Sequence, residues 1–401
     1  MEKKFINVSA NENNPLWDKI IMRETPLYKR DNDLRTDFER DYTRVIYTNA
    51  YRRMKHKTQV FFSPTNDHIC TRIEHVNNVE SISYTIANAL GLNTSLTKAI
   101  ATAHDIGHSP FGHRGEKILS NISQKEIGKT FWHEKNGLDV VDKIELLEDN
   151  NGFKKNLDLT YAVRDGIISH CGEVNEKFLK PREEFIDLQT YVTPNQYSPF
   201  TWEGCVVKIS DKISYISRDI EDAILLGLLD DSLEELHEIL KFEKKAIINN
   251  SVIINKLIFD LCTNSNPDDG LIFSDESLQL LDNIKAFNYK NIYYSDKVLA
   301  SEKYFELVLT QIFEILKSAY DKENTLENLN KMKKNYNSVV TPFIKWINCY
   351  WNLTDRENTN LQNKILFDIN NKKDYLKAII YYISGMTDNY AIECYNNIIG
   401  F

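Results

Sequence analysis

The chain has 401 residues, of which 42% are hydrophobic and 27% are charged, and its formal net charge is -9. This composition fits a globular protein of one large domain or two. The negative charge argues against a protein whose main task is to coat nucleic acid, although it is compatible with a local basic groove. The six cysteines include no CxxC pair and no stretch is apolar enough for a signal segment or a bilayer span, so we expect a cytoplasmic protein without a zinc ribbon, a disulfide framework or a membrane partner.

The first part of the chain predicts helices, because apolar residues recur at steps of three and four and alternating patterns are rare. Residues 72–90 carry one such apolar stripe, and Gly91 is expected to end that helix. Asn93 or Thr94 can cap the next helix, over 95–106.

The run HDIGHSPFGHRGE at 104–116 follows directly. Gly107 ends the second helix, and Ser109–Pro110 is a suitable cap and first position for a third. His104 and Asp105 are therefore expected at a helix C-terminus beside a tight turn, where two ligands can be held rigidly next to an open pocket.

Residues 203–228 give the clearest helical pattern, with isoleucines and a valine along one side. A second stripe on nearly the opposite side contains Asp211, Tyr215, Asp219 and Asp222. The ordinary interpretation of this stripe is the solvated acidic face of a surface helix.

The rest of the chain reads as further helices, after a loop at 264–270 and with polar connections at 322–338 and 355–373. A subdomain boundary is expected between residues 230 and 270.

Four residues far apart in the sequence offer the nitrogen and oxygen ligands that mid-strength divalent metals accept: His75, His104, Asp105 and Asp211. Together they form a His2Asp2 set with open positions for water and a substrate oxygen, where a metal acidifies the water and polarises a phosphoryl oxygen. Singly each has an ordinary explanation, because an HD dipeptide is common by chance and His75 alone fits a histidine on a helix face. The hypothesis of a metal site therefore depends on the whole set.

The same run supplies an acid–base pair. His113 and Glu116 lie three residues apart in the third predicted helix, so they share a face and suit proton transfer, whereas the ordinary interpretation is a surface ion pair. His108 falls in the turn beside the proposed metal. His133 is either a packed histidine or a partner for phosphate or proton transfer.

His170 and Glu173 are weaker candidates of the same kind. Cys171 adjoins His170, but a nucleophilic Cys–His pair is disfavoured because neighbouring residues on a helix point in different directions.

Binding a triphosphate requires cations in a chain of net negative charge. Arg72 lies one turn before the first proposed metal ligand, and Lys212 adjoins the last. The ordinary interpretation of both is a solvent-exposed charge. Tyr215 and Asp219 lie one and two turns beyond the last ligand, where they can contact a sugar or a base.

These motifs together resemble the HD-domain superfamily, with its pattern H…HD…D, and within it the deoxynucleoside triphosphate triphosphohydrolases, often called dGTPase-like proteins. The similar segments are 35–61, 66–79, 104–116, 161–173, 209–223 and 383–391. The resemblance implies an all-α fold, with an HD-domain helical core and an additional C-terminal helical region. We expect an N-terminal segment at 1–60 that contributes to the site, a metal-binding core at 61–230 and a C-terminal region at 231–401.

The resemblance also implies roles. Metal ligands would be His75, His104, Asp105 and Asp211, and the ion would be Mn, Mg, Fe or Co. Catalytic residues would be His113, Glu116, His108 and His133. Substrate-binding residues would be Gln59, Arg72, Lys212, Tyr215 and Asp219, with the last two and Gln59 selecting deoxyribose. The expected reaction is attack of a water on the α-phosphorus of a dNTP, giving a deoxynucleoside and triphosphate.

Further partners implied by the resemblance are other copies of the chain in a tetramer or hexamer, a regulatory nucleotide and single-stranded nucleic acid. The sequence departs from common bacterial relatives at Arg218, where many have histidine, and it lacks a recognisable distal arginine or lysine for phosphate.

Two alternatives stay open. The chain is also consistent with an HD-domain phosphohydrolase that acts on nucleoside monophosphates or cyclic nucleotides. It is also consistent with a catalytically silent nucleotide sensor or nucleic-acid scaffold that retains the metal, although the intact His113 and Glu116 disfavour that alternative.

Overall fold

The computed structural model describes residues 2–27, 32–62, 66–171, 178–230, 232–241 and 250–400. The fold is all-α, as predicted: helices dominate these ranges, and the strands form two small antiparallel pairs. The strands are β1 (Leu147–Glu148) with β2 (Lys154–Lys155), and β3 (Phe178–Leu179) with β4 (Leu271–Ile272). No helix in the described ranges is long and apolar enough to cross a membrane.

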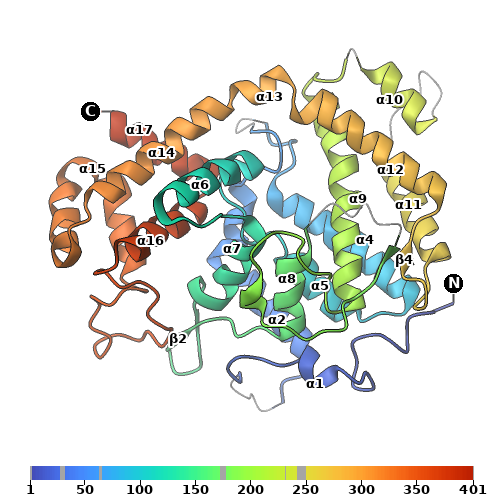
Figure 1. The fold of residues 1–401 in the computed structure, drawn as a ribbon, viewed down its shortest axis with the longest axis horizontal. Coiled ribbons are helices and arrows are strands. Elements are labelled where there is room, and N and C mark those ends of the chain that lie inside the picture. Colours follow the sequence, from blue (N-terminus) through green and yellow to red (C-terminus); the bar gives the residue numbers. More distant parts are fainter. Residues whose placement is uncertain are drawn as a thin grey trace.

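Helix α4 (Arg72–Leu90), which carries the first predicted metal ligand, packs against α5 (Thr94–Ala103) and α9 (Trp202–Leu225) (Figure 1). Its boundaries confirm the prediction, because Gly91 follows it with φ 85°, a left-handed conformation that glycine adopts without steric cost. Asn93 caps α5 by accepting a hydrogen bond from the Leu96 backbone N–H.

The acidic side of α9 is not a solvated face, so the ordinary interpretation of that stripe is wrong. Asp219 and Asp222 are buried, and Asp222 accepts a hydrogen bond from the Cys70 backbone N–H at 3.0 Å. Burial is the main reason that the pKa of Asp222 rises to about 6. The long helix is covered on both sides because α4 and later helices pack around it.

The remaining helices surround this centre. Before α4 lie α1 (Trp17–Ile20), α2 (Asp37–Ile46) and α3 (Asn49–Arg53), followed by a 3-10 turn, η1 (Met54–His56). Between α5 and α9 lie α6 (Gly112–Ile127), α7 (His133–Asp139), the π-turn η2 (Val140–Ile144), α8 (Tyr161–Ser169) and the 3-10 turn η3 (Leu188–Thr190). After α9 come α10 (Leu233–Leu240), α11 (Asn250–Asn264), α12 (Asp275–Asn288), the π-turn η4 (Tyr289–Tyr293), α13 (Asp296–Ala300), α14 (Glu302–Ser318), the 3-10 turn η5 (Lys322–Asn324), α15 (Thr325–Ile347), α16 (Lys372–Ser384) and α17 (Asp388–Ile399).

The C-terminal helices form one buried core with α6, on the side of the molecule away from α4 (Figure 1). Large apolar side chains of α14 to α17 fill this core, and α6 contacts both α14 and α16. A second core joins α4 and α9 to α11 and α12. The later helices thus support elements on both sides of the site; the boundaries 1–60, 61–230 and 231–401 stay a prediction.

Residues 322–338 are not the expected polar connection, because α15 begins at Thr325 and includes most of them. Apolar residues recur at steps of three in this helix and belong to the C-terminal core: Leu326, Leu329 and Met332. Lysines and asparagines between them hide this apolar stripe in the sequence. The loops expected at 264–270 and 355–373 are present; α16 begins at Lys372.

Candidate metal centre and active site

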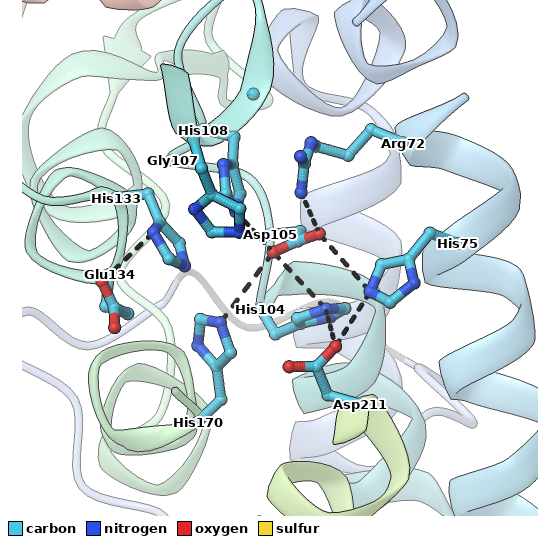
Figure 2. A network of polar contacts seen from close by, with 12 residues as sticks. Arg72, His75, His104, Asp105, Gly107, His108, His133, Glu134, His170 and Asp211 are labelled. Atoms are coloured by element: carbon cyan, nitrogen blue, oxygen red, sulfur yellow. Dashed lines mark hydrogen bonds and ion pairs between the residues drawn. The ribbon is translucent and has the colours of Figure 1, made fainter. Parts of the chain in front are cut away.

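Three helices bring the four predicted metal ligands together (Figure 2). α4 contributes His75, the end of α5 contributes His104 and Asp105, and α9 contributes Asp211. The Nε2 atom of His75 lies 2.9 Å from Asp211 Oδ1 and 3.7 Å from Asp105 Oδ2. His104 Nε2 lies 3.5 Å from Asp105 Oδ1 and 4.0 Å from Asp211 Oδ1. All four side chains therefore converge on one small volume.

The protonation of His104 suits a metal ligand. Its Nδ1 lies 2.6 Å from the Ala101 backbone oxygen, so Nδ1 carries the proton and Nε2 presents a lone pair. His104 is completely buried, and Nε2 has no hydrogen-bond partner in the described structure. An orphaned nitrogen between two carboxylates fits a divalent cation, and the mixed imidazole and carboxylate donors suit Mn, Fe or Co.

Arg72 anchors one of these carboxylates. Its fully buried guanidinium donates to Asp105 Oδ2 at 2.6 Å and to the backbone oxygens of Thr58 and Gln59, both at 3.3 Å. Burial opposes ionisation of Asp105, but the neighbouring His104 and Arg72 outweigh it and hold the pKa of Asp105 well below its ordinary value. The Asp105 carboxylate is thus kept ionised, the form that a metal ligand requires.

A second cluster of titratable groups adjoins the first. Glu116 of α6 lies between two imidazoles: its Oε2 is 3.1 Å from His113 Nδ1 and 3.1 Å from His133 Nδ1. The ring of His108 stacks on that of His133 at 3.8 Å, and His108 Nε2 lies 3.1 Å from Asp105 Oδ1. His108 therefore connects the four predicted metal ligands with the cluster around Glu116.

The histidines of this cluster differ in their environments. Burial opposes protonation of His133, but Glu134 and Glu116 raise its pKa well above the ordinary value. Burial and the charges of Arg72 and His133 keep the pKa of His108 well below it. The side chain of His113 is 67% exposed, so its imidazole is open to an incoming ligand while Glu116 orients it.

Helix α6 does not begin at Ser109–Pro110 as predicted. It begins at Gly112, because Phe111 takes a left-handed conformation with φ 63°. The buried Phe111 ring stacks on Phe305 at 4.1 Å, and its N–H donates to Asp388 Oδ1 at 2.9 Å. Tertiary contacts from the C-terminal region thus decide where α6 starts.

Asp388 also holds the segment that precedes Gln59. Its second oxygen accepts the Thr58 N–H at 2.7 Å. Lys57 donates from Nζ to the Ser384 oxygen at 2.9 Å and to the His108 oxygen. The role of 383–391 was not readable from the sequence, because its partners are the backbone N–H groups of Thr58 and Phe111 and the side chain of Lys57, all distant along the chain. In the structure this segment holds both loops of the site in place.

The predicted sugar-binding residues lie beyond the metal ligands. Gln59 is buried, and its side-chain oxygen has no hydrogen-bond partner in the described structure. Asp219 is buried and accepts the hydroxyl of Tyr293, and burial raises its pKa to about 7. Tyr215 and Lys212 are half-buried on α9. Tyr293 was missed, because nothing in its local sequence links it to α9.

His170, at the end of α8, lies in the cluster: its Nε2 is 3.9 Å from Asp105 Oδ1. Burial keeps its imidazole neutral by lowering its pKa to about 3. Burial also raises the pKa of Cys171 to about 12, so the thiol stays protonated, in agreement with the rejection of a nucleophilic Cys–His pair. Glu173 lies outside the described residues.

The model of the HD domain matches residues 72–216, the segment that contains all four converging ligands. A deoxyguanosinetriphosphate triphosphohydrolase-like protein from Caldanaerobacter subterraneus is 34% identical over 91% of this chain and 86% of its own length. The chain belongs to this family. A relative of the same name from Rickettsia bellii is 31% identical over 94% of both chains, and one from Desulfatibacillum aliphaticivorans is 34% identical over 70% of this chain and 73% of its own.

The family and the four converging side chains together make this protein a metal-dependent phosphohydrolase of the HD-domain type. The match extends far beyond the HD segment, over the C-terminal helices that hold α6 and the 57–59 loop in place.

Proposed function

We propose that this protein hydrolyses deoxynucleoside triphosphates to a deoxynucleoside and intact triphosphate. The observation that carries the proposal is the placement of the Glu116 cluster directly beside the metal ligands, joined to them by His108. A water nucleophile at phosphorus and a proton donor for the leaving oxygen can then act side by side. The printed names of the relatives support a nucleoside triphosphate as the substrate.

His75, His104, Asp105 and Asp211 would hold the divalent ion. When bound, that ion supplies Lewis-acid activation of a phosphoryl oxygen and of the attacking water. Asp105 and Asp211 are suited to this because nearby positive and imidazole groups hold the pKa of each below its ordinary value against the opposing effect of burial.

His113 is assigned to the leaving group. The water oxygen forms a bond to the α-phosphorus, the bond from that phosphorus to the sugar 5′-oxygen breaks, and a proton from His113 neutralises the 5′-oxygen. Glu116 orients the imidazole from Nδ1, at 3.1 Å. His108 and His133, whose rings stack at 3.8 Å beside Glu116, are assigned to the triphosphate.

Arg72 and Lys212 are assigned to the phosphate charges, with Arg72 acting from its place against Asp105. Gln59, Tyr215 and Asp219 are assigned to the deoxyribose: Gln59 and Asp219 hold the 3′-hydroxyl, and the tyrosine ring occupies the space of a 2′-hydroxyl. The unpaired side-chain oxygen of buried Gln59 supports this assignment, because a buried acceptor without a partner favours a ligand that donates to it.

The test is chromatography of the products formed from each dNTP, one dNMP and one cyclic dinucleotide, with Mn, Mg, Fe and Co in turn. We expect a deoxynucleoside and triphosphate only from the dNTPs. In labelled water the label should enter the triphosphate, and label in orthophosphate released from the γ-position would contradict the proposal. His104→Ala and Asp211→Ala should each lose both metal and activity.

The proposal extends to the surroundings of the reaction. By family resemblance we expect a cytoplasmic tetramer or hexamer that binds a regulatory nucleotide, and single-stranded nucleic acid is a further candidate partner. Light scattering after size-exclusion chromatography tests the assembly, and rates for one dNTP in the presence of a second dNTP test the regulation.

A further inference from the structure

Arg114 lies in the first turn of α6, directly after His113, and the proposed reaction leaves it without a role. Its Nη2 donates to the backbone oxygen of Tyr293 at 3.0 Å, across 179 positions of the chain. Its Nη1 lies 3.7 Å from Glu302 Oε2, and 18% of the side chain is exposed. Arg114 therefore ties the helix that carries the acid–base pair to the segment that follows α12.

Tyr293 ends the π-turn η4, and turns of this kind are rare and occur mostly at functional sites. Its hydroxyl donates to Oδ2 of the buried Asp219 at 2.5 Å. Asn288, the last residue before the turn, donates to the Ile216 backbone oxygen at 3.0 Å, which fixes the start of the turn on α9. The end of the turn is held from α6, by Arg114.

The hydroxyl of Tyr293 occupies one of the two oxygens of the Asp219 carboxylate. A carboxylate that is bonded at one oxygen has a restricted orientation, and this orientation determines where its other oxygen can accept a hydrogen bond. The proposed function gives Asp219 a hydrogen bond from the 3′-hydroxyl of the sugar. A shift of the Tyr293 backbone would therefore move the sugar contact.

A surface ion pair is the ordinary interpretation of Arg114, and such pairs contribute little to stability. Lys117, one turn further along α6, has that arrangement: it lies 2.7 Å from Glu302 Oε1, and its side chain is 67% exposed. Arg114 shares Glu302 with Lys117 but also bonds the backbone of Tyr293. Lys117 is therefore a matched control, because replacing it disturbs the shared carboxylate without removing the bond to the turn.

We propose that Arg114 is a positioning residue for substrate binding: by holding the backbone of Tyr293, it keeps Asp219 oriented toward the 3′-hydroxyl of the nucleotide. The inference rests on the proposed function for the identity of the substrate. It predicts that the protein prefers a dNTP to the 2′,3′-dideoxynucleoside triphosphate of the same base, and that this preference depends on Arg114. Because Arg114 acts on the sugar contact, its loss should change KM more than kcat.

The kinetic test compares Arg114→Met and Lys117→Met in the full-length protein with Mn(II), using a dNTP and its dideoxy analogue. The wild type and Lys117→Met should favour the dNTP in kcat/KM by about 10- to 100-fold, the effect of leaving a buried acceptor unpaired. Arg114→Met should lose most of this preference, chiefly through a higher KM for the dNTP. Arg114→Lys should restore part of it, because an ammonium group keeps a donor for the Tyr293 oxygen.

Hydrogen exchange gives a second readout that needs no turnover. The amides of residues 289–294 should exchange about 10-fold faster in Arg114→Met than in the wild type, whereas Lys117→Met should match the wild type. If Arg114→Met fails to fold, Arg114→Lys decides by the same measurements, with intermediate values expected in both.

The proposal is overturned if Arg114→Met keeps the wild-type exchange rates or the full preference for the dNTP. It is also overturned if Lys117→Met shows the same losses, or if the wild type hydrolyses both nucleotides equally well. A wild type that hydrolyses no dNTP would contradict the proposed function, and the exchange rates would then decide alone whether Arg114 holds Tyr293.

Discussion

Replacing Asp388 with alanine should weaken both the fold and the site. The buried carboxylate accepts the backbone N–H of Thr58 at 2.7 Å and that of Phe111 at 2.9 Å. Each N–H stranded without an acceptor costs about 1–3 kcal/mol, so the two together cost about 2–6 kcal/mol. Burial raises the pKa of Asp388, which means that the wild type already bears a desolvation cost that alanine removes. We therefore expect a loss of about 2–4 kcal/mol in the free energy of unfolding.

The effect on activity follows from the two loops that Asp388 joins. One leads into Gln59 and the other into the first turn of α6, which carries His113. A displacement of about 1 Å at such groups lowers rates by roughly 100-fold. Asp388→Asn should fall between the wild type and Asp388→Ala, since one amide oxygen can accept one N–H while the amide nitrogen faces the other.

The measurements are urea unfolding and steady-state kinetics with dNTP substrates. Asp275→Ala is the matched control, because Asp275 is an exposed aspartate in the first turn of α12 and shares only the favourable position at a helix N-terminus. If Asp388→Ala unfolds at the same urea concentration as this control, or keeps the wild-type kcat/KM, the clamp described here does not operate.

Three further changes test other parts of the site. Glu116→Gln should lower kcat by about 100- to 10,000-fold with little change in stability, because it removes the carboxylate that orients the acid–base histidines. An unchanged pH–rate profile would count against this orienting role of Glu116. Asp219→Asn should stabilise the protein at neutral pH, because burial raises the folded pKa of Asp219 from an ordinary 3.8 to about 7, so the wild type loses stability as the pH rises from about 4 to about 7. The free energies of unfolding of variant and wild type should therefore diverge by at most about 4 kcal/mol across that range, and a constant difference between them refutes the shift. Gly107→Ala should unfold the site, because an added Cβ would lie 2.1 Å from the His133 oxygen and 2.2 Å from the Gly137 nitrogen; a variant with wild-type thermal stability contradicts this packing.

Local sequence was sufficient for the elements whose signals are local. The apolar stripe of α4, the glycine after it and the asparagine cap of α5 each act through neighbours in the chain, and the structure confirms all three. Motif spacing and the resemblance to a known family singled out the four side chains that converge, because metal chemistry restricts which residue types can serve as ligands. Their role as metal ligands stays a prediction.

Tertiary structure decided the features whose partners are distant in the sequence. The start of α6 moved because Asp388 and Phe305 hold Phe111 in a left-handed conformation, against the local preference for Ser109–Pro110. The acidic side of α9 became buried because later helices cover it, which no pattern within α9 reveals. The place of His170 beside Asp105 likewise appears only when α8 packs against the end of α5. The periodicity of a helix shows which of its faces is apolar. Whether a polar group on another face is buried depends on the helices that pack against it, and their contacts are not visible in the sequence of the helix itself.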